Sequence, residues 1–190
     1  HKSERDACKV IMLGVQYGMS AYGMGQKAGL HVLEAENMLQ RHKDVYYTFW
    51  KWADQNVNAG LAGIELHTIF GWKIRTGKGR DVKENTFLNW PMQANGAEML
   101  RLACIALEED GIGICAPVHD AILIEAPLDE IDTHVALATS IMQKASEWVL
   151  GRGRQCRVDA EIVRWPDRYI DGRGTDMWSF IQSRLGEEAA

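Results

Sequence analysis

The pattern of apolar and polar positions divides the chain into helical stretches and two hairpins. In residues 91–110 the apolar positions recur with helical spacing, Pro91 suits the first position of a helix and Gly111 suits its end. Residues 112–126 are expected to fold back as a hairpin. The other predicted elements are glycine-broken helices over 3–30 and 31–59, a turn over 58–63, a hairpin over 67–82 that turns at Thr76–Gly79, a helix over 129–150, a strand over 155–165 and a short amphipathic turn near Trp178. This order of elements predicts an α+β fold.

The composition is that of an ordinary soluble protein, with 46% hydrophobic and 25% charged residues. No apolar run approaches the ~18 residues of a membrane span and no secretory signal opens the chain, so we expect a cytoplasmic protein without a membrane partner. The net charge of −5 argues against a generic nucleic-acid coat but allows a local basic cleft. The four cysteines lack metal-clip spacing, and we expect them to be buried, reduced thiols. Because the chain begins with His, we expect a piece of a longer protein.

The segment "RDACKVIMLGVQYGMSAYG", residues 5–23, carries Arg5, Lys9, Leu13 and Tyr17 at intervals of four. On a helix these four side chains share one face, and small or apolar residues occupy the other. Such a row suits a nucleoside triphosphate, because the cations can meet phosphates, the apolar residue the sugar and the ring a base. The alternative is a solvated helix face without a ligand.

Two amides stand four residues apart in "NWPMQANGAEM", residues 89–99. Asn89 and Gln93 lie near a predicted helix N-terminus, where amides often serve as caps. They could equally donate hydrogen bonds to DNA bases and sugars. The segment alone leaves both readings open.

The stretch "PVHDAIL", residues 117–123, places His119 and Asp120 at the join of two apolar runs. Two-residue hairpin loops favour Asn-Gly or Asp-Gly because they need positive φ, so a His-Asp pair breaks a local rule. An aspartate held at a rigid turn can bind a hard cation such as Mg²⁺. The alternative is an exposed turn that holds a strained pair.

Taken in order, the three segments resemble the C-terminal part of family A DNA polymerases, the DNA polymerase I type. "RDACKVIMLGVQYGMSAYGMG" resembles motif B, "NWPMQANGAEML" resembles the family's N-x-PMQ segment and "VHDAILIEAP" resembles motif C. The resemblance extends from about residue 3 to about residue 165. It implies helical fingers over residues 1–66 and part of an antiparallel-sheet palm over residues 67–190.

The resemblance also implies a reaction and a role for each candidate residue. The reaction is template-directed nucleotidyl transfer on primer-template DNA with dNTPs and two Mg²⁺ ions, in replication or repair, in the bacterial nucleoid or a phage-infected cell. Arg5 and Lys9 would hold the triphosphate, Leu13 would lie against its sugar, and Tyr17 would adjoin the nascent base pair and template. Asn89 and Gln93 would contact the DNA minor groove. His119 would support the primer terminus, and Asp120 would hold the catalytic metal.

This chain departs from the family pattern at several positions. Leu13 stands where the family usually has an aromatic residue, Ala121 where motif C usually has Glu, and Asn85 where a basic residue is often found. No "DYSQIE"-like motif A occurs in residues 1–190, so we expect the second metal-binding carboxylate before His1. We therefore expect the 190 residues alone to be inactive.

Two alternatives remain open at the level of the sequence. The chain could be a non-catalytic derivative that binds DNA or nucleotides, as Ala121 and the missing motif A suggest. It could also be a subunit that docks to a partner chain carrying motif A through a face formed by Trp50, Trp52, Trp72 and Trp90.

Overall fold

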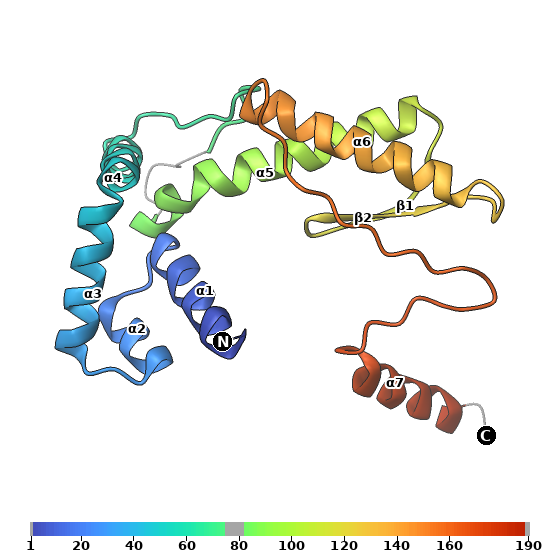
Figure 1. The fold of residues 1–190 in the computed structure, drawn as a ribbon, viewed down its shortest axis with the longest axis horizontal. Helices are drawn as coiled ribbons and strands as arrows, with labels where there is room; N and C mark the ends of the chain where they lie inside the picture. The colour runs from blue at the N-terminus through green and yellow to red at the C-terminus, as the bar shows by residue number, and fades with distance from the viewer. Residues whose placement is uncertain (1, 75–81, 189–190) are drawn as a thin grey trace. The chain divides into compact units, whose positions relative to one another are not determined.

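The computed structural model describes residues 2–74 and 82–188 (Figure 1). Its helices are α1 (Lys2–Gln16), α2 (Ala21–Ala28), α3 (Val32–Val45), α4 (Tyr47–Leu61), α5 (Glu84–Glu109), α6 (Ile131–Leu150) and α7 (Thr175–Glu188), and its strands are β1 (Gly113–Val118) and β2 (Ala121–Glu125). Helices together with a two-stranded antiparallel sheet confirm the predicted α+β class.

The chain forms two compact units, His1–Leu102 and Ala103–Ala190, and the division falls within α5. The predicted division into fingers (1–66) and palm (67–190) concerns function and stays a prediction.

In the first unit, α1, α2 and α3 pack around Val15, Met24 and Ala35, which are all buried. Caps fix where the helices begin and end. Ser20 accepts a hydrogen bond from the N–H of Gly23 at the start of α2, and the imidazole of His31 forms a capping box at the start of α3.

A second contact of this unit joins α4 to the N-terminal part of α5. Phe87 is 2% exposed and lies so close to Gly60 that a Cβ at that glycine would be 2.2 Å from the ring. Only glycine leaves room for this approach, so the packing of α4 on α5 depends on the missing side chain.

The core of the second unit lies between the end of α5, the hairpin and α6. Leu107, Ile112 and Ala138 are buried there, and isoleucines from β1, β2 and α6 pack against them. The strands pair from Gly113↔Glu125 to Val118↔Ala121, and the register shifts by one residue at Cys115. This bulge keeps Ile114, Ile122 and Ile124 on the packed face although the pairing slips.

The predicted helix at 91–110 begins earlier than expected. α5 starts at Glu84, so Pro91 lies inside the helix and not at its first position. Proline removes one backbone hydrogen bond, to the carbonyl of Phe87. The burial of Phe87 against α4 favours helical structure before the proline and accounts for the longer helix. The helices predicted over 3–30, 31–59 and 129–150 are confirmed with adjusted ends.

Of the two turns predicted in the middle of the chain, the structure describes only the first. α4 continues to Leu61, so the turn predicted at 58–63 is confined to its last residues. Before the predicted turn at Thr76–Gly79, the chain reverses between the bridged residues His67 and Lys73, with φ of +85° at Gly71. The predicted turn at Thr76–Gly79 lies outside the described residues.

The strand predicted over residues 155–165 is wrong. This segment is extended but pairs with no strand among the described residues. It is held to α6 by other means, because the N–H of Cys156 donates to Ser146 Oγ over 2.8 Å and Arg164 pairs with Asp132 over 2.7 Å. Alternation of side chains indicates an extended backbone, but a strand also needs a partner.

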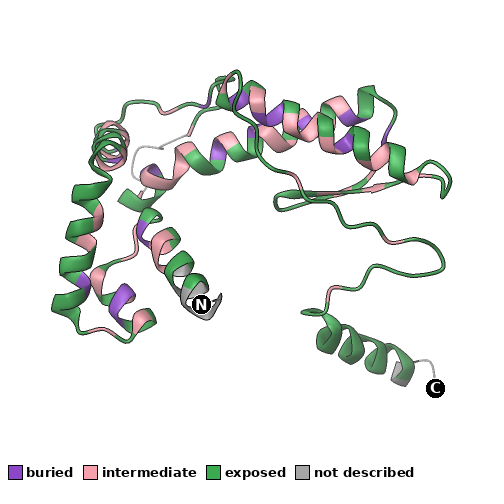
Figure 2. Ribbon diagram, viewed as in Figure 1, coloured by how far each residue is buried: buried purple, intermediate pink, exposed green. Residues whose placement is uncertain are grey.

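The C-terminal turn predicted near Trp178 is a full helix, α7, and its described side chains are exposed (Figure 2). The cysteine prediction is correct in one respect and wrong in another. All four thiols are free, but Cys8, Cys115 and Cys156 are exposed and Cys104 is only partly buried. Within the described ranges no helix is long and apolar enough to cross a membrane.

Candidate functional site

The exposed face of α1 agrees with the predicted helical phase. Arg5 and Lys9 are exposed, and Leu13 is 43% exposed. On the opposite side Ile11 packs against the core and Val15 is only 2% exposed. The packed side of α1 was predicted correctly, but Val15, its deepest described residue, was missed.

Tyr17 and Gly18 form the C-terminal cap of α1. The N–H of Met19 donates to the carbonyl of Gly14 over 2.8 Å, and the N–H of Gly18 donates to the carbonyl of Val15 over 3.0 Å. Gly18 has a φ of +85°. This is a Schellman C-cap, in which glycine supplies the left-handed backbone and two terminal carbonyls are satisfied. Tyr17 is thereby fixed at the last turn with 43% of its surface exposed.

The N-terminal part of α5 lies beside the end of α1 (Figure 1). Three of its amide residues contact Tyr17 or Gly18, and we call Asn85, Asn89 and Gln93 the amide row. Their spacing of four places them on one face of α5. Asn89 Nδ2 donates to the carbonyl of Tyr17 over 3.4 Å, and Gln93 Nε2 donates to the Tyr17 hydroxyl over 3.3 Å. The structure therefore brings together three of the predicted site residues.

Asn85, the first residue of the amide row, packs against Gly18. Its Oδ1 lies 2.4 Å from the place where a Cβ of Gly18 would stand. From the sequence, Asn85 stood out only as a departure from a family pattern. Its contact with Gly18 was missed, since no local pattern connects residues so far apart in the chain.

The remaining two predicted site residues form the turn between β1 and β2. Val118 pairs with Ala121, so His119 and Asp120 are a two-residue loop. His119 has a φ of +55°, the one positive value among the described non-glycine residues. Both side chains are exposed, and neither has a hydrogen-bond or ion-pair partner in the described part of the chain. The turn thus presents an imidazole and a carboxylate to solvent on a strained backbone.

A buried carboxylate that sequence reasoning missed supports α5 next to the amide row. Glu98 is 1% exposed; it accepts a hydrogen bond from Thr68 Oγ1 over 2.6 Å and one from the Arg101 guanidinium. Thr68 Oγ1 also accepts the N–H of Trp72 over 2.9 Å. Glu98 therefore ties residues 68–72 to α5. An acid four residues after the buried Ala94, with an arginine three residues later, was the available signal.

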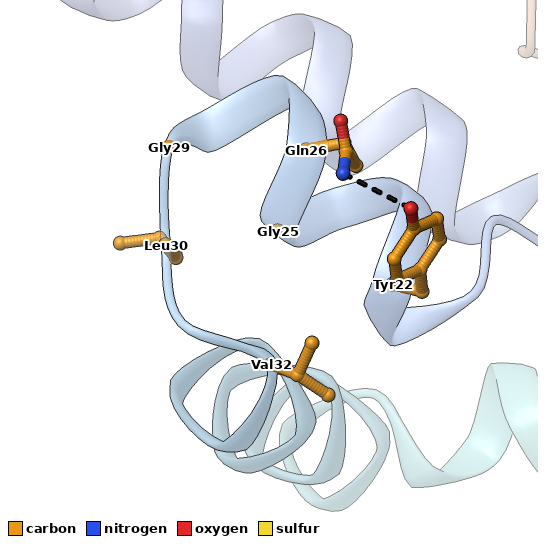
Figure 3. Close-up of a pocket in the computed structure, with 6 residues that line it drawn as sticks. All are labelled: Tyr22, Gly25, Gln26, Gly29, Leu30 and Val32. Carbon is orange, nitrogen blue, oxygen red and sulfur yellow. Dashed lines mark hydrogen bonds between the residues drawn. The ribbon is translucent and has the colours of Figure 1, made fainter.

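A separate surface pocket of about 270 Å³ lies where α2 leads into α3. Figure 3 shows the hydrogen bond that Gln26 Nε2 donates to the Tyr22 hydroxyl at its rim, over 3.1 Å. Its lining contains no charged side chain and none of the predicted site residues: Tyr22, Gly25, Gln26, Gly29, Leu30 and Val32.

The sequence profile of DNA polymerase family A matches residues 1–163. This range contains all three motif-like segments. The chain belongs to DNA polymerase family A.

Individual members of the polymerase family are distant in sequence. Over 150 residues the chain is 28% identical to the thermostable DNA polymerase I of Thermus aquaticus, a match that covers 73% of this chain and 18% of that protein. It is also 28% identical to the DNA polymerase I of Deinococcus radiodurans, over 74% of this chain and 16% of that one. The chain therefore spans less than a fifth of the length of these relatives.

The fold also matches that of a family A polymerase. The structure resembles the POL domain of Pol1 from M. smegmatis, solved in complex with DNA primer-template and dNTP. The TM-score is 0.63 at 24% identity, and the match covers 74% of this chain and 27% of that one.

Family A polymerases imply a divalent metal, so the residues present must be tested against such a site. Asp120 offers an exposed carboxylate of the kind that Mg²⁺ binds. Within residues 2–74 and 82–188, however, no three His, Cys, Asp or Glu side chains are grouped so that they could hold an ion. The described residues therefore do not by themselves form such a site.

Proposed function

We propose that these 190 residues form the fingers and part of the palm of a template-directed DNA polymerase. The family match supports the reaction class. The observation that carries the proposal is the exposed row from Arg5 to Tyr17, which ends against the amide row. Two cations, an apolar side chain and a phenol follow each other along one face, in the order in which a nucleoside triphosphate presents phosphates, sugar and base.

In this proposal Arg5 and Lys9 bind the triphosphate and Leu13 contacts the sugar. Tyr17 lies by the nascent base pair, while Asn89 and Gln93 donate to the minor groove of the primer-template. The hydrogen bonds from these amides to Tyr17, at 3.4 and 3.3 Å, are long, so exchanging them for bonds to DNA costs little.

The turn of the palm hairpin has two roles in the proposal. His119 supports the primer terminus, and Asp120 is one ligand of the catalytic metal. In this proposal the other carboxylates belong to motif A, which does not occur in residues 1–190. When bound, Mg²⁺ would stabilise charge that develops during phosphoryl transfer.

The test is Asp120→Asn in the assembled polymerase, meaning these residues together with the polypeptide that carries motif A. This change keeps the shape of the side chain and removes its negative charge. Primer extension should fall by about 100-fold or more, as for other losses of preorganised charge, while primer-template binding stays within a few-fold. Asp129→Asn, at another exposed aspartate of the same unit, is the matched control and should leave extension unchanged. Extension by Asp120→Asn within a few-fold of the unmodified protein would refute the metal role.

A further inference from the structure

The helix that carries the amide row has a weak point within the row. Pro91 lies between Asn89 and Gln93, and a proline inside a helix removes one backbone hydrogen bond and crowds the preceding turn. The direction in which Gln93 points therefore depends on what holds α5 on both sides of the proline. On the N-terminal side, Phe87 is fixed against Gly60 of α4.

A tight turn supports α5 around and beyond the proline, and we call residues 68–72 the bracing turn. It contacts α5 through three pairs of residues, Trp72–Trp90, Ile69–Asn95 and Thr68–Glu98. The two indole rings meet edge to face, with centroids 5.6 Å apart. The contacted positions 90, 95 and 98 lie before and after Pro91, so the bracing turn spans the weak point of the helix.

The hydroxyl of Thr68 fastens the bracing turn to the helix. Thr68 Oγ1 donates to Glu98 Oε1 over 2.6 Å, and both side chains are buried. The same oxygen accepts the N–H of Trp72 over 2.9 Å, while the N–H of Thr68 donates to the carbonyl of Trp72 over 2.8 Å. The hydroxyl thus uses its donor and its acceptor capacity at once, and it joins both ends of the bracing turn to α5. Hydrogen bonds to a carboxylate are stronger than those between neutral groups.

Asn95 extends this support back to the proline. Its Oδ1 accepts the N–H of Ile69 over 3.4 Å, and its Nδ2 donates to the carbonyl of Pro91 over 2.7 Å. At about 100° per residue, the three contacted positions of α5 lie roughly opposite the amide row. The bracing turn can therefore fix the direction of the amide row without covering it.

We propose that Thr68 and Glu98 are positioning residues for the contact between the amide row and primer-template DNA. The inference rests on the proposed function, in which Asn89 and Gln93 donate to the minor groove. Thr68 and Glu98 are buried on the other side of α5, so they act through Gln93, whose helical turn they hold in place. A donor that is already held in its binding direction loses less conformational freedom on binding.

The test is a double-mutant cycle on primer-template affinity in the assembled polymerase, measured by fluorescence anisotropy without dNTP. Gln93→Ala should weaken binding about tenfold, because it removes a hydrogen bond to DNA. Thr68→Val keeps the shape of the side chain but removes the hydroxyl, and it should weaken binding about fivefold. Because Thr68 acts through Gln93, Thr68→Val should cause less than about a twofold further loss in the Gln93→Ala background. A side chain that only stabilised the fold would cause the same loss in both backgrounds.

Two further variants accompany the cycle. Thr68→Ser retains the hydroxyl and should restore affinity to within about twofold of the unmodified protein. Thr133→Val, at an exposed threonine of α6, is the matched control and should leave affinity unchanged. If far-UV circular dichroism shows that Thr68→Val does not fold, Asn95→Ala takes its place in the cycle. It removes the link between Ile69 and Pro91, and its effect must depend on Gln93 in the same way.

Three results would overturn the inference. They are an equal loss from Thr68→Val in both backgrounds, an affinity of Thr68→Val within about twofold of the unmodified protein, and a loss in Thr68→Ser as large as that in Thr68→Val. Failure of the proposed function would be seen in a different arm, because Gln93→Ala alone would then leave primer-template affinity unchanged. The inference would fall with it.

Discussion

Replacing Gly18 by alanine should destabilise the first unit by about 2 kcal/mol, through two separable effects. The first is backbone strain, because the φ of +85° costs an L-residue roughly 1–2 kcal/mol. The second is the loss of space for Asn85, whose Oδ1 and Cγ would lie 2.4 and 2.8 Å from the new Cβ. Since Asn85 is exposed, its amide can turn into solvent, so the second effect should be smaller, about 0.5–1 kcal/mol.

Two further variants separate these effects in urea unfolding followed by circular dichroism. Gly29→Ala introduces a Cβ at a similar φ of +67°, where no atom lies within 4 Å, and therefore measures strain alone. Asn85→Ala combined with Gly18→Ala removes the clash but keeps the strain. We expect Gly18→Ala to cost more than Gly29→Ala and the double variant to recover the difference.

The reasoning would be refuted if Gly18→Ala and Gly29→Ala were equally destabilising, or if the Asn85→Ala background recovered nothing. Either result would mean that the amide row does not press against the end of α1. As a control, the free energy of unfolding should depend on urea concentration with the same slope in all variants. A changed slope would indicate a different unfolded state.

Two other predictions concern the sugar contact and acid stability. Leu13→Phe should change the relative use of dideoxy- and deoxynucleotides in primer extension. It should alter the free energy of unfolding by less than about 0.5 kcal/mol, because Leu13 is 43% exposed. Unchanged sugar discrimination with a large stability loss would instead place Leu13 in the core. Acid should weaken the fold in two pH ranges, to which His42 and Glu147 contribute respectively. Burial lowers the pKa of His42 below 6.5, so the unfolded chain takes up a proton first, and stability that is present above pH 6.5 falls as the pH drops below it. The pKa of Glu147 is lowered from 4.5 to about 2, chiefly by the N–H of Gly153, so its contribution is complete above pH 4.5 and is lost as the pH falls toward 2. His42→Gln should reduce the loss of stability below pH 6.5. Glu147→Gln should reduce the loss below pH 4.5 but not abolish it, because the pKa of Asp171 is also lowered to about 2. A curve of unfolding free energy against pH that neither variant changes would contradict the assignment.

Features that depend on neighbours in the sequence were predictable. The hairpin over 113–125 and α6 follow from local alternation and helical spacing. The exposed face of α1 follows from the spacing of Arg5, Lys9 and Leu13 alone. The positive φ that a two-residue loop needs was also expected, and His119 adopts it.

Features that depend on distant contacts were not predictable. α5 begins before Pro91 because Phe87 packs against Gly60, a residue on another helix. Residues 155–165 alternate like a strand, but pairing needs a partner that the local pattern cannot supply. Glu98 resembles any helical acid until Thr68, thirty positions away, is seen to bond with it.

The left-handed backbone at His119 has a consequence for how selection acts on this turn. Glycine there would relieve roughly 1–2 kcal/mol of strain, and asparagine part of it. A mutant library screened only for survival of heating should therefore lose His119, whereas a library screened for primer extension should keep it. Comparing the frequency of histidine at position 119 between the two surviving pools would then show how the contribution of the imidazole to activity compares with its cost in stability.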